Sequence, residues 1–226
     1  MQQLDILVFG QMERDYSIGL TNIFINACNE RLFRTFDNIE AEAECAMQDT
    51  WKLLNERFGY EGGPDEADIA EWAEDHGVRI YSDLKFAQSW VIGLAAAGVY
   101  HFLERILKEF LVREIPRHKS KIQGLSFPGI VKFFENFGWR IENEPFYDEI
   151  RVLSLVANTI KHGDGGSCDE LGRLRPELFM GEWQKDGDHI VICADNLNVT
   201  EDAFANFAAA VLSFWKNFPD GLTCKS

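Results

Sequence analysis

Residues 82–113 read SDLKFAQSWVIGLAAAGVYHFLERILKEFLVR, a strongly apolar run without proline. Its apolar side chains recur at intervals of three and four residues, which is the spacing of one face of an α-helix. Gly93 and Ala97 are small enough to let a neighbouring helix pack closely. We therefore expect a long helix that ends before Pro116 and forms the centre of a helical bundle. Its predicted inner face consists of Leu84, Ala87, Val91, Leu94, Gly98, Phe102, Ile106 and Phe110.

Helical patterns on both sides of this run predict the other elements. In residues 13–58 apolar side chains recur at heptad spacing, which predicts one helix, or two if Asp37 and Asn38 interrupt it. Residues 61–75 carry seven acidic side chains and no Lys or Arg, and they predict a short, solvated amphipathic helix. The residues of this helix expected to face the body of the protein are Ile69, Ala70 and Trp72. Further helices are predicted over 127–137, 145–162 and, after an N-cap at Thr200, up to about Phe218.

The predicted fold class is all-α. The run HisIleValIleCysAla, which starts at His189, has β-branched character and predicts a short strand or half of a hairpin near residues 188–198. No series of parallel strands is visible, so a doubly wound α/β fold is not expected. We expect an N-terminal helical region over 1–78 that packs on a helical domain over 79–226.

Composition narrows the classes of function. The 226 residues include 37 Asp and Glu against 22 Lys and Arg, a formal charge of −15, which argues against a surface that binds nucleic acid all over. A small basic site remains compatible with this balance, because residues 105–121 carry six Lys or Arg and two Glu. The absence of a signal-peptide pattern, of a long unbroken apolar window and of paired cysteine motifs predicts a cytoplasmic protein without a membrane span. No phosphate-binding glycine loop follows a strand, so no nucleotide or other cofactor is expected.

One predicted helix end carries a group of polar side chains that could take part in catalysis. In helical geometry Asn158, Lys161 and His162 gather on one turn, and glycines at 163, 165 and 166 end the helix. His can transfer a proton near neutral pH, Lys can neutralise phosphate charge, and Asn can orient the His or a scissile group. The alternative is structural, because a cationic side chain in the last turn of a helix is favoured by the helix dipole.

The residues AlaAsnThrIleLysHisGly, 157–163, resemble the motif helix of HEPN domains, the higher-eukaryote and prokaryote nucleotide-binding helical bundles. The resemblance implies a dimeric all-α fold and, for many members, a metal-independent endoribonuclease of toxin–antitoxin or phage-defence type. Asn158 and His162 match the polar residue and the His of that motif, whereas Ala157 stands where the family has Arg. The resemblance spans about residues 82–218, and its motif is short.

Other residues complete the candidate site. His101 and Glu104 share one face of the long helix, where they are expected either to meet Asn158 and His162 across the bundle or to form a polar network or a surface pair with Lys108. Arg151 lies about 16 Å from His162 along the helix axis, so a dimer would be needed to bring the two together. Candidate substrate-binding residues are Arg105, Arg151, Arg173 and Arg175, and no metal site is expected.

Two functions follow from these residues. In the first, His162 is the general acid or base in attack of a ribose 2′-OH on the adjacent phosphate, Asn158 orients it, and Lys161 with Arg105 stabilises the developing charge. The expected partners are then RNA, a second copy of the chain and a cognate antitoxin. In the second, the chain is a non-catalytic helical module that dimerises or binds a partner protein.

Overall fold

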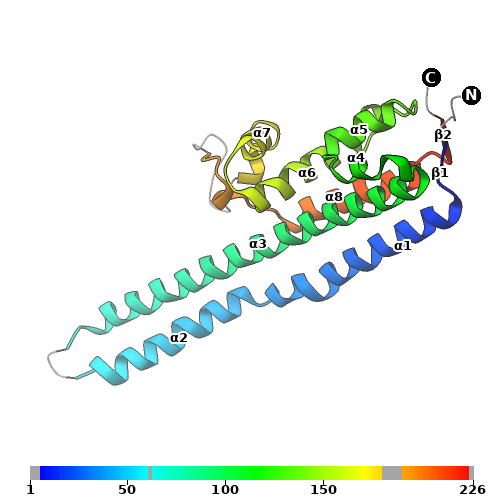
Figure 1. Cartoon of the computed structure of the whole chain (residues 1–226). Helices are drawn as coiled ribbons and strands as arrows, with labels where there is room; N and C mark the ends of the chain where they lie inside the picture. The colour runs from blue at the N-terminus through cyan, green and yellow to red at the C-terminus, as the bar shows by residue number, and fades with distance from the viewer. Residues whose placement is uncertain (1–5, 61–62, 180–189, 224–226) are drawn as a thin grey trace, which may run out of the picture. The chain divides into compact units, whose positions relative to one another are not determined.

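The computed structural model describes residues 6–60, 63–179 and 190–223. Over these residues the chain is helical apart from one two-stranded antiparallel sheet (Figure 1), which confirms the predicted fold class. The sheet pairs β1 (Ile6–Val8) with β2 (Gly221–Thr223). The strand expected near 188–198 is not formed over 190–198, where the chain is irregular apart from a 3-10 turn at Ala194–Asn196; residues 188 and 189 lie outside the described residues. Among the described residues no strand pairs with the β-branched run, and an isolated strand is not stable.

The chain forms two compact units. One, the bundle unit, comprises residues 1–28 and 92–226, and the other, the hairpin unit, comprises residues 29–91. Helix α3 (Glu66–Glu114) contributes to both, and the boundary at 91–92 falls inside it. The division expected between residues 78 and 79 coincides with neither boundary. The reason is that the first helix pairs with elements near the end of the chain and not with its sequence neighbours.

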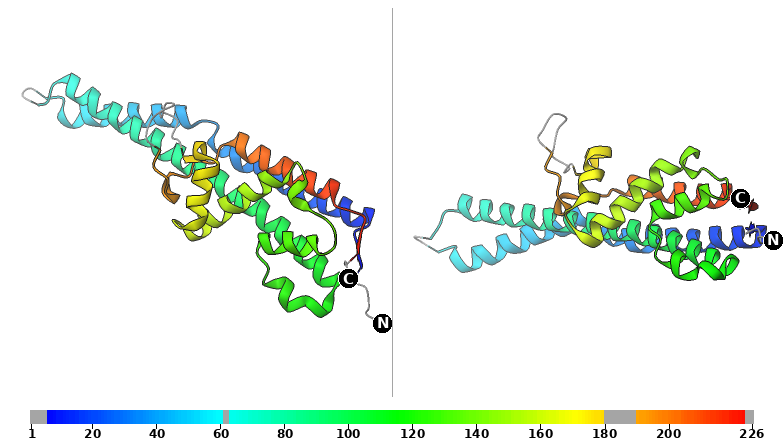
Figure 2. Two further views of the ribbon diagram at one scale, coloured as in Figure 1. Left: turned by 90° about the horizontal axis from the view of Figure 1, so that it is seen from above. Right: turned by 45° about the horizontal axis from the view of Figure 1, so that its top comes forward.

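The bundle unit is built around α6 (Tyr147–His162) and α8 (Glu201–Asn217), both close to their predicted ranges. Helix α8 is in contact with α1 (Gln11–Ala27), and the two lie side by side when seen from above (Figure 2, left). The Thr200 hydroxyl accepts a hydrogen bond from the Ala203 amide at 3.2 Å, which confirms the predicted N-cap. The remaining helices of the unit are α4 (Lys119–Gln123), α5 (Phe127–Glu135) and α7 (Gly166–Leu174).

Aromatic side chains fill the core of this unit where the sheet meets the helices. Phe218, just after α8, contacts rings from four different segments of the chain. Its ring centroid is 4.3 Å from that of Phe9 and 5.0 Å from that of Trp139. Aromatic burial of this density is a large part of the hydrophobic stabilisation of a small unit. The cluster comprises Phe9, Phe110, Phe134, Trp139, Phe214, Trp215 and Phe218.

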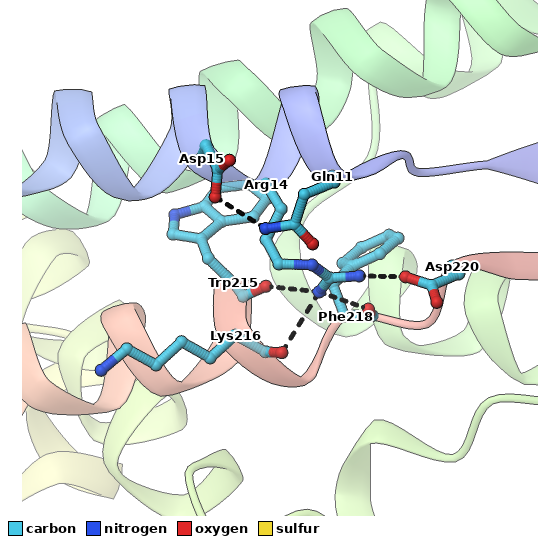
Figure 3. Close-up of polar contacts among 7 residues, drawn as sticks. All are labelled: Gln11, Arg14, Asp15, Trp215, Lys216, Phe218 and Asp220. Carbon is cyan, nitrogen blue, oxygen red and sulfur yellow. Dashed lines mark hydrogen bonds and ion pairs between the residues drawn. The ribbon is translucent and has the colours of Figure 1, made fainter.

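A buried arginine joins the first helix to the end of the last one (Figure 3). The Arg14 guanidinium donates hydrogen bonds to the main-chain oxygens of Trp215 (3.0 Å), Lys216 (3.2 Å) and Phe218 (2.7 Å), and it pairs with Asp220. Carbonyl groups at the end of a helix have no partner within the helix. A cation placed there also meets the negative end of the helix dipole. Arg14 therefore caps α8 from another element, and the sequence gives no local sign of it.

The hairpin unit pairs α2 (Ile39–Phe58) with the part of α3 that ends at Val91. A π-helical turn (Cys28–Leu32) and a 3-10 turn (Phe33–Phe36) precede α2, so the open choice between one and two N-terminal helices is resolved in favour of two. Gly77 allows close packing, because a Cβ there would lie 2.9 Å from the Met47 Cβ and 3.3 Å from the Ala43 oxygen.

Three expectations for α3 were wrong. Helix α3 is continuous from Glu66, so no separate short helix occupies the described part of 61–75. Ile69 and Ala73 are buried and make the contact with α2, whereas Ala70 and Trp72 are exposed. The contact face of a two-helix pair is narrow, and Trp72 lies about 100° around the helix from Ala73. Leu94, expected on the inner face, is 54% exposed.

By length and composition α3 is able to cross a bilayer, and it is the only such helix in the described ranges. The sequence predicted no membrane span, because the unbroken apolar run within this helix is shorter than a bilayer requires. Core helices of soluble proteins meet the same criteria, and Leu103, Leu107 and Leu111 of α3 are buried in the bundle unit. This property alone does not indicate a membrane anchor.

Candidate functional site

The candidate site is the C-terminal end of α6. Gly163, with φ of 73°, closes the helix by donating its amide hydrogen bond to the Thr159 oxygen at 2.8 Å. The final turn places Asn158, Lys161 and His162 together, with Asn158 half-buried and the other two exposed. This placement on one turn agrees with the expected helical geometry. It presents an amide, an ammonium and an imidazole at the surface of the bundle unit.

These three side chains have no fixed partner among the described residues. Across residues 6–60, 63–179 and 190–223, none of them makes a hydrogen bond or an ion pair with another described residue. The neighbouring Asp164 is engaged, because its carboxylate accepts a hydrogen bond from the Ala194 amide at 2.6 Å. A general base normally has a second group that holds its ring in position. The described surroundings of His162 supply none.

The position at which the HEPN motif has arginine lies in the core of the bundle unit. Ala157 is fully buried, in a stretch of α6 where every residue from Val152 to Ala157 is buried. A guanidinium at this position would place a charge in the core, and burying a charge carries a large cost in free energy. The difference from the HEPN motif is therefore one of packing as well as of residue type.

The structure does not bring His101 and Glu104 to the end of α6. Gly93 of α3 is the residue that abuts the end of α6, because a Cβ on it would lie 3.1 Å from the Ile160 Cδ1. His101 is eight residues further along α3, about 12 Å at 1.5 Å per residue. There the neighbouring Tyr100 contacts Phe127, and Phe127 stacks on Tyr147, which is the first residue of α6.

Glu104 instead links its helical neighbours. Its carboxylate lies 3.7 Å from the His101 Nδ1 and 3.1 Å from the Lys108 Nζ. This arrangement corresponds to the second of the two expectations for His101 and Glu104, a polar pair with Lys108 on α3. The side chains of Glu104 and Lys108 are both 22% exposed, so the pair is partly shielded from solvent. The composite site expected across the bundle is thus not formed.

Three candidate substrate-binding arginines are held by intramolecular contacts near α7. Arg151 donates to Glu170 at 2.5 Å, and this hydrogen bond raises the pKa of the guanidinium. Arg173 donates to the Asp169 main-chain oxygen at 3.2 Å. Arg175 contacts Glu149 at 3.0 Å and also pairs with Glu177. Arg105, on α3, stacks over the Phe102 ring at 5.1 Å and has no carboxylate partner among the described side chains.

No group of three His, Cys, Asp or Glu side chains able to hold a metal ion occurs among the described residues. Comparisons of the chain with protein-family models, with curated proteins and with solved structures found no match. The resemblance to HEPN domains therefore rests on residues 157–163 alone and stays a prediction.

A second surface was missed in the sequence. Trp72 (48% exposed) and Phe86 (55%) lie two heptads apart on α3, and Trp90 follows Phe86 by one turn. The Phe86 and Trp90 rings are in edge contact at 6.3 Å. Helical geometry places Trp72, Phe86 and Trp90 on one side of α3, and we call these three residues the aromatic stripe. The heptad spacing of these aromatic residues could have predicted this surface from the sequence.

Proposed function

We propose that this chain is a non-catalytic helical protein that binds a partner protein through the aromatic stripe of its hairpin unit. The observation that carries the proposal is the exposure of Trp72 and Phe86 on a unit made of only two helices. Two packed helices cover a narrow apolar face, and a helical bundle normally needs a third or fourth helix to bury the rest. Large exposed aromatic side chains in such a setting are typical of binding surfaces.

Charge favours a cationic partner over a second copy of the chain. Residues 29–91 contain 15 Asp or Glu and 6 Lys or Arg, a net charge of −9. Two hairpin units in contact would repel each other, whereas a basic amphipathic helix would gain both apolar burial and opposite charge. We therefore assign the stripe to a basic amphipathic helix of a partner, such as a cognate regulatory protein. The predicted homodimer becomes the competing outcome.

A pair of peptides tests this assignment. A labelled 18-residue amphipathic helix of Lys and Leu should bind the wild type, measured by fluorescence anisotropy, and its Glu and Leu counterpart should not. The variant W72E/F86E should weaken binding at least about tenfold, since one lost aromatic anchor costs roughly 2 kcal/mol. The control Y60E/V78E makes the same charge change at two other exposed apolar residues of the hairpin unit and should have little effect.

Two results would contradict the proposal. Equal weakening by the two double variants would mean that the peptide responds to net charge and not to the stripe. A dimer of the wild type in light scattering that becomes monomeric in W72E/F86E would assign the stripe to a second copy of the chain.

The second candidate function is the metal-independent endoribonuclease of defence or toxin–antitoxin type that the HEPN resemblance implies. The observation in its favour is that Lys161 and His162 are exposed together and have no partner in the part of the chain that the structure describes. In this function His162 moves the proton of the ribose hydroxyl, and Lys161 neutralises phosphate charge. Asn158 contributes a hydrogen bond from the same turn.

Cleavage of RNA tests this candidate directly. A mixed RNA pool incubated with the protein in EDTA should be cut, and His162→Ala should abolish the cutting. His76→Ala changes a half-buried imidazole in the hairpin unit and serves as the control. Intact RNA with the wild type, or equal cutting by wild type and His162→Ala, would leave only the partner-binding function.

A further inference from the structure

The end of α3 and the short helix α4 carry a concentration of positive charge. Residues 105–123 contain six Lys or Arg and two Glu, a net charge of +4 in a chain of −15. The two elements are in contact, because the Lys108 Nζ lies 3.4 Å from the Gln123 main-chain oxygen at the end of α4. Two adjoining helices therefore carry this positive charge.

Part of this charge is not used internally. Lys108 is held by Glu104 at 3.1 Å, and Arg113 is held by Glu13 and Glu114. Arg105, Lys119 and Lys121 are exposed, and none of them pairs with a carboxylate of a described residue. Glu109 is the one other acidic residue in the segment. We call Arg105, Lys119 and Lys121 the basic end.

We propose that the basic end binds the phosphodiester backbone of a nucleic acid. Clustered Lys and Arg side chains bind phosphate by releasing counterions, and this binding requires no recognition of bases. A lipid surface is disfavoured, because no large exposed apolar side chain lies between residues 105 and 123 to enter a bilayer. The proposal is independent of the aromatic stripe, which lies in the hairpin unit.

The salt dependence of binding follows from the number of cations. Three phosphate contacts to a single strand give a slope of log affinity against log salt of about −2. Affinity should then fall about 20-fold between 50 and 200 mM NaCl. Removing two of the three contacts should reduce the slope to about −0.7.

The test uses fluorescence anisotropy of labelled 20-nucleotide oligo(U) and oligo(dT) with the full chain in EDTA. The wild type should bind at 50 mM NaCl, and K119E/K121E should bind at least about tenfold more weakly with a flatter salt slope. The control K52E/K216E makes the same charge change at two exposed lysines elsewhere and should stay within about twofold of the wild type. W72E/F86E should bind as the wild type does, which separates this proposal from that of the stripe.

Several results would overturn the inference. These are no binding by the wild type at 50 mM NaCl, equal weakening by both lysine double variants, and displacement by polyglutamate as effective as by unlabelled oligonucleotide. Binding to vesicles of phosphatidylserine that K119E/K121E abolishes would assign the basic end to a membrane instead. If K119E/K121E melts early in circular dichroism, K119Q/K121Q replaces it, with about half of the loss in affinity expected. A difference between oligo(U) and oligo(dT) identifies RNA or DNA as the natural source of the backbone.

Discussion

Replacing Arg14 with Met removes the cap of α8 while keeping most of the apolar stem of the side chain. The three main-chain oxygens that the guanidinium binds, at 2.7, 3.0 and 3.2 Å, then lose their donor. A buried acceptor left without a partner costs about 1–3 kcal/mol, and the bonds to Trp215 and Phe218 are buried. We expect R14M to lower the free energy of unfolding by about 3–5 kcal/mol.

The ion pair of Arg14 with Asp220 makes a smaller contribution. The Asp220 side chain is 88% exposed, and exposed pairs contribute about 0–1 kcal/mol at most. D220N should therefore cost less than about 1 kcal/mol, and it serves as the matched control for R14M. R14K should lie between the two, because the single Nη1 nitrogen that makes all three carbonyl bonds lies further along the side chain than a lysine Nζ reaches.

Urea denaturation followed by far-UV circular dichroism measures these differences. In a chain of this size each kcal/mol shifts the melting temperature by about 2–4 °C, so R14M should melt roughly 10 °C below the wild type. A cost of R14M below about 1 kcal/mol, or one equal to that of D220N, would refute the reasoning that the carbonyl bonds carry the stability.

Three further predictions concern the bundle unit. Ala157→Arg, which restores the family residue, should cost more than about 3 kcal/mol and create no RNA cleavage, because the position is fully buried; a stable, cleaving variant would contradict this. Burial, and after it the charge of Glu104, raises the pKa of the Tyr100 hydroxyl. The protonated hydroxyl therefore contributes its full stabilisation below about pH 10, the ordinary tyrosine pKa, and this stabilisation is lost as the pH rises above that value. Melting curves from pH 9 to 11 should thus fall less for Tyr100→Phe than for the wild type, and parallel curves would exclude the effect. Gly163→Ala should cost about 1–2 kcal/mol because φ is 73°, whereas Gly124→Ala, at φ of −86°, should be tolerated; equal costs in urea titrations would refute the assignment.

Elements whose signals are local were predicted well. The apolar spacing of α6, the glycine stop at Gly163 and the Thr200 cap each lie within a few residues of the feature that they define. The two strands have no such signal, since three-residue segments are too short to show a pattern. The continuity of α3 was missed because the acidic composition before residue 76 resembled that of a separate surface helix.

The candidate site was predictable only within one helix. Helical periodicity predicts that residues 158, 161 and 162 share one turn. A contact between this turn and His101 could not be predicted, because it depends on the position along α6 at which α3 packs. That register is set by the fit of Gly93 against Ile160, which no spacing in the sequence reveals. The role of Arg14 was also missed, because its partners lie about 200 residues away along the chain.

The pairing of β1 with β2 has a consequence for synthesis on the ribosome. Leu7 is synthesised 215 residues before its partner Leu222, so the sheet and the contact of α1 with α8 form only after nearly the whole described chain has left the exit tunnel. Until then Phe9 and its neighbours stay exposed to water and to other nascent chains. Closing so long a loop slows this step, whereas the local contacts of the hairpin unit form without it. The bundle unit is therefore the last part of the described chain to complete its fold during translation.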